Sequence, residues 1–177
     1  MRISRSACLV SLLALGACAS KPSPPPGPQP RPTNVPRSLP GGVSPATYVA
    51  QAASIDLFVV RSSELALVRS LRRDVRDFAT RMIAAHQGTA AQLSFAGRRL
   101  DLLPAASMLP QHQAMYDELE AASDFDRAYL RLQRAIHGAS LSLHADFAAR
   151  GTSPTLRPVA ENAAAVERSH LEMLRRL

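Results

Sequence analysis

The sequence has few cysteines, no tryptophan and no long apolar run. Its two cysteines, Cys8 and Cys18, both lie in the first 18 residues, so no disulfide can cross-link the rest of the chain. The apolar run over residues 7–17 is shorter than the about 20 residues that a membrane-spanning helix needs. Phosphate-binding glycine loops and the Gly-x-Ser-x-Gly motif are also missing. We therefore predict no catalytic residues.

Acidic residues are missing from the N-terminal part of the chain. The whole sequence has 21 Lys and Arg against 14 Asp and Glu, for a formal net charge of +7. Five of the basic residues and none of the acidic ones lie in residues 1–40, which leaves 16 arginines against 14 acids in residues 41–177. A nucleic-acid-binding domain needs a basic stripe, and this excess is too small and too scattered to form one. We expect no nucleic-acid partner.

The first residues follow the pattern of a secretion signal. Two arginines, Arg2 and Arg5, precede the apolar run, which ends in the sequence LGAC at residues 15–18. These four residues resemble the lipobox of bacterial lipoproteins. That resemblance implies cleavage after residue 17, a diacylglyceryl group on the thiol of Cys18 and a fatty acid such as palmitate on the new amine. Several acyl chains anchor a protein firmly in a membrane. Ala19 stands where an inner-membrane retention signal has Asp, so we predict an outer-membrane lipoprotein that faces the periplasm.

Residues 18–45 are predicted to be a disordered tether behind the lipidated cysteine. Ten prolines occur among residues 21–45. Proline fixes φ and lacks an N–H, which excludes a regular helix or an inner strand. In a polyproline-like conformation this segment could reach roughly 75 Å at about 3.1 Å per residue.

Residues 46–177 are predicted to form the folded domain, because their apolar residues recur at helical spacing and no alternating strand pattern is present. Ser44 and Pro45 are typical of a helix start. Ser123 and Asp126 have the spacing of a capping box. The predicted helices cover residues 46–70, 73–100, 111–122, 123–151 and 156–177.

Four of these helices are long and have one-sided apolar stripes, which favours a four-helix bundle. In the first helix we place Val68, Leu71 and Glu64 on the buried stripe. The connection over residues 101–123 is long enough to cross the bundle and carries the short extra helix. Such a crossover makes the helices at 73–100 and 123–151 parallel. The predicted fold class is therefore all-α, a ferritin-like four-helix bundle.

Three sequence blocks carry a further resemblance. They are VRDFATRMIAAH, FDRAYLRLQRAIH followed by LSLHADFA, and VERSHLEML. They resemble the signature blocks of an uncharacterised bacterial family of predicted outer-membrane proteins, domain of unknown function 4142. The likeness runs from about Tyr48 to the C-terminus. It implies a ferritin-like fold and an envelope location, and it implies no activity.

Three histidines fall among apolar neighbours on predicted helices. His86, His137 and His170 each stand 13 or 14 residues into a helix, about 20 Å from one end at 1.5 Å per residue. They are therefore able to meet in one layer at mid-height. On the helix at 123–151 the polar residues Asp126, Gln133, His137 and His144 share one side. His112, next to Pro110, is expected at the surface.

Two hypotheses explain these buried-looking histidines. They could form a polar network in which Asp126, Gln133 and His144 supply hydrogen bonds and fix the register of the helices. Alternatively, His86, His137 and His170, with Glu167 or Glu64, could bind a transition metal. Imidazole suits Zn and Cu as well as Fe. The hypotheses differ in whether these side chains converge on one point.

A di-iron centre is disfavoured by the carboxylates that the sequence lacks. Such centres use a Glu from each of two helices and a Glu-x-x-His pair from each of the other two. The chain has one such pair, Glu167 with His170, while Ile83 and Arg134 stand at the corresponding position before the other two histidines. Relative to the family, Ala85, Ile136 and Val59 also replace common acidic residues. Our leading hypothesis is a non-enzymatic binding or structural protein of the envelope, and the alternative is a transition-metal-binding protein. A protein partner in the envelope is left open.

Overall fold

The structure is a computed structural model, and residues 42–177 are the part of the chain that it describes. The predicted signal peptide, Cys18 and most of the predicted tether lie outside the described residues. Residues 42–177 contain no strand, and none of their helices is long and apolar enough to cross a membrane. The helices are α1 (Pro45–Arg69), α2 (Arg73–Arg98), α3 (Pro110–Ala121), α4 (Phe125–Arg150) and α5 (Arg157–Leu174). The predicted all-α class is confirmed.

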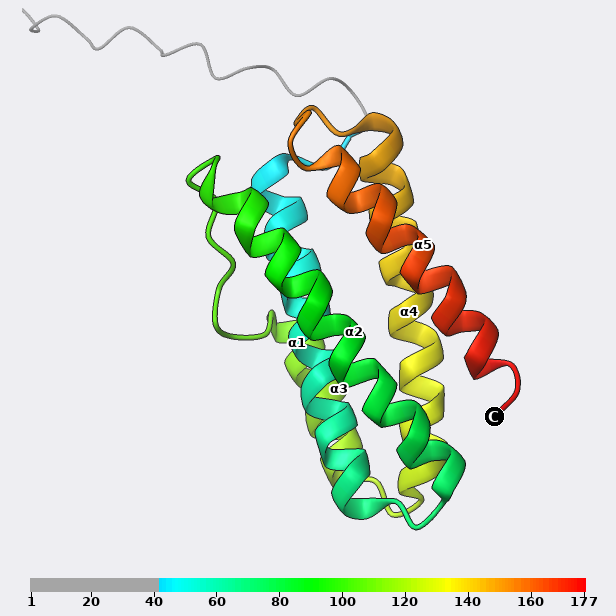
Figure 1. Ribbon diagram of the computed structural model, residues 1–177. Coiled ribbons are helices and arrows are strands. Elements are labelled where there is room, and N and C mark those ends of the chain that lie inside the picture. Colours follow the sequence, from blue (N-terminus) through cyan, green and yellow to red (C-terminus); the bar gives the residue numbers. More distant parts are fainter. Residues whose placement is uncertain (1–41) are drawn as a thin grey trace, which may run out of the picture. The chain divides into compact units, whose positions relative to one another are not determined.

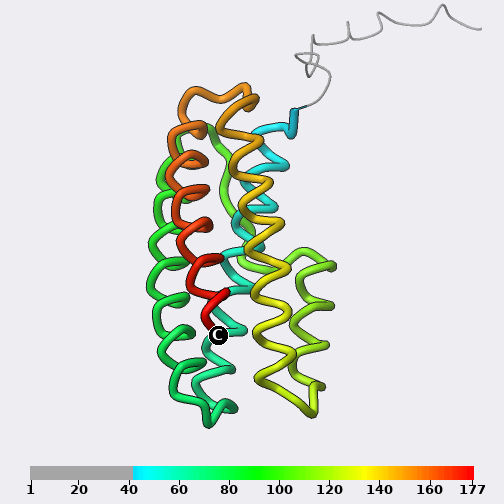
Figure 2. Tube along the Cα trace, turned by 90° about the vertical axis from the view of Figure 1, so that its right-hand side faces the viewer, coloured from blue at the N-terminus to red at the C-terminus, as the bar shows by residue number. Residues whose placement is uncertain are grey.

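Four long helices lie side by side in the bundle (Figure 1). The antiparallel pairs α1–α2 and α4–α5 share the most extensive helix contacts. Between the two pairs the chain returns through residues 99–109 and then through α3, which packs against α1 and α4. This crossover makes α2 and α4 run in the same direction, which can also be followed in Figure 2. The predicted bundle with a long crossover is confirmed.

The starts of two helices show which capping predictions were right. The Ser44 side chain accepts a hydrogen bond from the Thr47 N–H at 3.1 Å, and Pro45 is the first residue of α1, as expected. The predicted cap at Ser123 is wrong. Helix α4 begins at Phe125, and the Asp124 carboxylate accepts from the Arg127 N–H at 3.3 Å. An acidic cap also interacts favourably with the positive end of the helix dipole.

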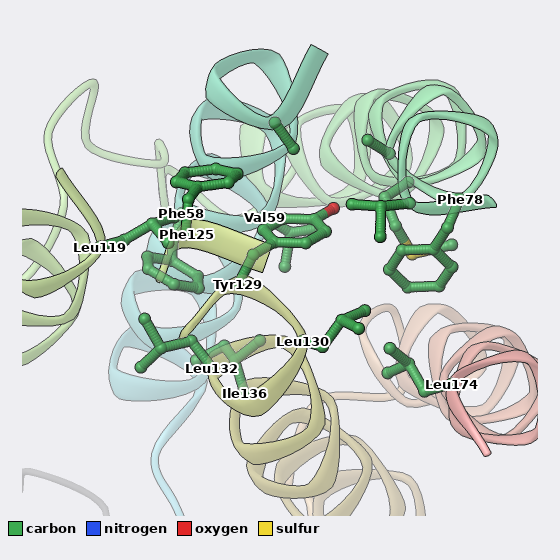
Figure 3. Close-up of a cluster of buried hydrophobic side chains, with 14 of the residues drawn as sticks. Phe58, Val59, Phe78, Leu119, Phe125, Tyr129, Leu130, Leu132, Ile136 and Leu174 are labelled. Carbon is green, nitrogen blue, oxygen red and sulfur yellow. The ribbon is translucent and has the colours of Figure 1, made fainter. Parts of the chain in front are cut away.

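The apolar core consists of two clusters stacked along the bundle. The first, which we call the Tyr129 cluster, includes Phe58, Phe78, Tyr129, Ile136 and Leu174 (Figure 3). The second, which we call the Phe147 cluster, includes Tyr48, Leu93, Phe147, Leu156 and Ala160. On every long helix, the residues of the two clusters are separated along the chain by buried polar residues. The core is therefore interrupted at mid-height by a polar layer.

Helix α1 is rotated relative to the prediction. Val68 and Leu71, expected on the buried stripe, are 80% and 98% exposed. Glu64 is also exposed, so its predicted place among buried groups is wrong. The face that α1 buries carries several small polar residues, among them Ser62 and Ser63. A stripe defined by apolar residues alone does not find such a face.

Candidate metal centre

The polar layer contains three histidines and one glutamate from three helices. His86 comes from α2, His137 from α4, and Glu167 and His170 from α5. Each of the four is at most 4% exposed. One potential ligand atom from each residue can be chosen so that all lie within 4.8 Å of one another. The three imidazole centroids are 5.2–5.3 Å apart. The predicted convergence of the three histidines at mid-height therefore occurs.

His86 is oriented by an acidic residue of α1. Its Nδ1 lies 2.8 Å from Oδ1 of Asp56, a buried carboxylate that also accepts a hydrogen bond from the Thr89 hydroxyl at 2.8 Å. Because the carboxylate oxygen accepts, Nδ1 of His86 carries a proton, and in the neutral form of the ring Nε2 then directs a lone pair at the other histidines. Histidines that bind a metal through one ring nitrogen usually donate the N–H of the other nitrogen to a carboxylate or carbonyl in this way.

His137 is oriented in the same sense by its own helix. Its Nδ1 lies 2.7 Å from the backbone carbonyl of Gln133, one turn earlier. A carbonyl can only accept, so Nδ1 carries the proton and Nε2 carries a lone pair. The Nε2 atoms of His86 and His137 are 3.4 Å apart. A cation bound between these two Nε2 atoms would be able to use a lone pair from each ring.

The two donors from α5 have buried atoms without partners. Glu167 uses Oε1 to accept a hydrogen bond from the Ser140 hydroxyl at 2.8 Å. Its Oε2 and the Nδ1 of His170 have no hydrogen-bond partner among the described residues, although both are buried. These two atoms are 4.0 Å apart, and Oε2 is 3.8 Å from Nε2 of His137. Unpaired polar atoms cost about 1–3 kcal/mol each when buried, so two of them at one point favour a bound partner such as a cation there.

Burial sets the protonation of the cluster. It lowers the pKa of His137 to about 3 and that of His170 to about 4, with a further lowering from nearby His86. Both rings are therefore neutral at neutral pH and have lone pairs to donate. Burial also raises the pKa of the Glu167 carboxyl to about 7. A bound cation would favour its ionised form.

The spacing of the donors fits a first-row transition metal. Zn–N bonds of about 2.0–2.1 Å in a tetrahedron place neighbouring ligand atoms about 3.3–3.4 Å apart. The 3.4 Å between the two Nε2 atoms matches this edge, and the 3.8 and 4.0 Å contacts of Glu167 are only slightly longer. All four ligand atoms lie within 4.8 Å of one another, so the side chains would have to rotate inward to surround one ion. The residues present therefore fit a mononuclear site with three nitrogen donors and one oxygen donor.

The structure places the remaining predicted residues outside this donor set. His144 is buried and shares a 3.0 Å hydrogen bond with the Tyr48 hydroxyl, and burial lowers its pKa to about 4. Gln133 donates to the Ser62 hydroxyl at 2.8 Å. Asp126 is half-buried, and its buried Oδ1 bonds to none of the described residues, so its predicted hydrogen bond to a histidine is absent from them. Glu64 is exposed and takes no part.

Two buried groups were not found from the sequence. Asp56 places a buried carboxylate of α1 against His86, three residues before Val59, where the family resemblance led us to expect an acid and the chain has none. The signal was helical spacing, because Asp56 continues the buried face of α1 that also carries Tyr48, Ala52, Val59 and Ser63. His112, expected at the surface, is 7% exposed and its Nδ1 lies 2.6 Å from the Ser54 hydroxyl.

Residues 31–177 match the family described as Domain of unknown function (DUF4142). The chain belongs to this family. The match covers the whole described bundle and confirms the resemblance seen in the three sequence blocks. No curated protein matches the chain.

Solved structures share the fold at low sequence identity. CopM in its Cu(II)-bound form is 13% identical, with a TM-score of 0.65 over 76% of this chain and 95% of that one. CopM in an Ag-bound form is 11% identical, with a TM-score of 0.63 over 76% and 94%. A DUF305 fragment from Deinococcus radiodurans is 16% identical, with a TM-score of 0.64 over 74% and 92%. These similarities support the same helical-bundle fold.

Proposed function

We propose that this chain is a transition-metal-binding protein of the bacterial envelope, whose ion is held by His86, His137, His170 and Glu167. The observation that carries the proposal is the meeting of four buried donors, with ligand atoms within 4.8 Å of one another. Two of those atoms, Glu167 Oε2 and His170 Nδ1, have no partner among the described residues. A cation at their common centre would satisfy both.

The donor chemistry favours a borderline divalent ion. Imidazole and carboxylate suit Zn(II), Cu(II) and Fe(II), whereas soft ions such as Ag(I) and Cu(I) prefer sulfur ligands. The structural similarity to CopM, which has been solved with copper and with silver, supports a metal in this fold but selects none for this chain. Four protein donors complete a tetrahedron, a closed arrangement typical of binding rather than catalysis. We accordingly expect no enzymatic activity.

The second candidate is a purely structural polar layer. Hydrogen bonds between helices favour it, since Asp56 with His86, Tyr48 with His144 and Ser62 with Gln133 each connect two helices. Such bonds would hold the register of the bundle without an ion. This candidate leaves the partnerless atoms of Glu167 and His170 unexplained, and we therefore place it second.

The envelope location rests on the sequence alone. The signal-like segment, the LGAC sequence ending at Cys18 and the proline-rich stretch support a lipid-anchored protein that faces the periplasm. Metal binding by the bundle does not depend on this anchor.

Metal content tests the proposal directly. The full chain, purified without a histidine tag and in mild detergent, is expected to contain close to one Zn, Cu or Fe per chain by mass spectrometry. The His86→Ala, His170→Ala double variant should lose that metal, and a His112→Ala variant is the matched control because His112 is buried outside the cluster. A wild type that takes up no metal on reconstitution would favour the structural layer.

A further inference from the structure

We infer that a cavity between α1 and α2, beneath residues 104–106, is the path by which the ion reaches the histidine layer. This inference rests on the proposed function. The four donors are at most 4% exposed, so an ion has to pass between helices to reach them. The cavity has a volume of about 260 Å³, and its lining includes both His86 and the carboxylate behind it, Asp56. Two further surface cavities include none of the four donors.

The inner end of the cavity has the chemistry to receive a cation. Asp56 is the one charged side chain in the lining. Its Oδ1 accepts from His86 and Thr89, and these two hydrogen bonds with described residues leave Oδ2 unused. A hard carboxylate oxygen can replace part of an ion's water shell before the imidazoles do so. Asp56 therefore lies at the inner end of the cavity and contacts His86, one of the four donors.

Four of the ten residues that line the cavity are alanines. Ala90 lies one turn after His86 on α2, and Ala53 lies three residues before Asp56 on α1. Across them lie Pro104 and two alanines of the crossover, and the larger side chains of Leu57, Val60 and Gln87 also line the space. These small side chains keep open a space that a leucine at one of the alanine positions would narrow.

The cover of the cavity is attached to α1 next to its inner end. Ser54 accepts a hydrogen bond from the Leu109 N–H at 2.7 Å and shares a 2.6 Å hydrogen bond with His112. At the other end of the crossover, the Leu102 N–H donates to the Gly97 carbonyl at 2.9 Å. Residues 104–106 lie between these two attachments and outside any helix. Non-helical backbone opens at lower free energy than the packed helices, which suits a cover over an ion path.

Rates of ion exchange test the path. The full chain in detergent would be mixed with Co(II), followed by its visible absorption in a stopped-flow instrument, and the ion would then be removed with a chelator. Ala90→Leu is expected to slow both association and release by about tenfold or more, with Kd unchanged, because a plug raises the barrier and leaves the donors as they were. Ala91→Leu is the matched control, since Ala91 is exposed and outside the cavity.

A second variant, at a different position of the cavity lining, controls for a folding defect in Ala90→Leu. Ala105→Leu adds the same group from the exposed crossover, where it disturbs no helix packing, and should slow both rates in the same way. Folded variants that exchange Co(II) as fast as the wild type would overturn the path while leaving the proposed function intact. A changed Kd with unchanged association would also overturn it, because Ala90 would then support the donors. A wild type that binds no Co(II) would overturn the proposed function and this inference together.

Discussion

Asp56 illustrates how a side chain outside the donor set can control the proposed ion site. Its carboxylate fixes the tautomer of His86 through a 2.8 Å contact and is itself fixed by the Thr89 hydroxyl. A charged acceptor makes the imidazole more basic and therefore a stronger donor to a metal. The negative charge also balances part of the charge of a divalent ion in a buried site.

Asp56→Asn is expected to weaken metal binding by about 10–100-fold. The amide oxygen of Asn can still accept the hydrogen bond from His86, so the ring keeps its orientation. The variant therefore removes only the negative charge of the Asp56 carboxylate. Competition with a chelator of known affinity measures the change in Kd. Asp146→Asn is the matched control, because Asp146 is an exposed carboxylate on α4 paired with Arg150. An unchanged Kd in the Asp56 variant would show that its charge does not support the ion.

The same residue marks a limit of sequence reasoning about the site. Counting residues along each helix was enough to bring His86, His137 and His170 to one level, because helical rise is constant. The choice of acid in α1 depended on the rotation of that helix. Its buried face includes Ser62 and Ser63, which an apolar stripe passes over, so Glu64 was placed inside and Asp56 was missed.

The helices themselves were the most predictable part of the fold. Long apolar repeats, the Ser44 cap and the stretch between α2 and α3 determine where each helix begins and ends, and the predicted bounds are close to those observed. The pairing of helices followed from loop length, since a short connection forces antiparallel neighbours. The details of the crossover did not follow, because the contacts of Ser54 with Leu109 and His112 join residues more than 50 positions apart.

Gly97 gives the crossover its start at the end of α2. A Cβ there would lie 2.2 Å from the carbonyl oxygen of Leu102, which is closer than any real contact. Gly97→Ala should therefore destabilise the protein by about 1–3 kcal/mol, since the backbone has to shift. Gly88→Ala is the matched control on the same helix, because its added Cβ meets nothing within 4 Å. It should stabilise by about 0.5–1 kcal/mol through helix propensity. Chemical denaturation measures both, and two equal effects would contradict the role of Gly97.

In the whole molecule, a layer of buried titratable groups separates the two apolar clusters of the core. The Tyr129 and Phe147 clusters supply apolar burial, and the polar layer between them carries His137, His144, His170 and Glu167. Burial favours the neutral form of each. The stability of the whole metal-free molecule is therefore linked to pH through this one layer.

The sign of that linkage can be worked out group by group. The folded-state pKa values of His137, His144 and His170 are lowered to about 3, 4 and 4, so below about pH 6.5 the unfolded chain binds protons that the folded chain excludes. Their contribution to stability is present above pH 6.5 and is lost as the pH falls towards 4. The pKa of Glu167 is raised to about 7, so its contribution is present at low pH and is lost as the pH rises through 7.

Three histidines outweigh one glutamate, and the metal-free protein should therefore lose stability between pH 6.5 and pH 4. Glu167→Gln removes the opposing group while its amide oxygen can still accept from Ser140. The variant should show a steeper loss in acid and, above pH 7, a metal-free stability equal to or greater than that of the wild type. Thermal melts of both proteins from pH 4 to pH 8 in the presence of a chelator measure this. A metal-free wild type as stable at pH 4.5 as at pH 7 would mean that the histidines are not held neutral by burial. Protons would then compete with the proposed ion for the histidines below about pH 6.5, and metal binding would weaken there instead of close to pH 4.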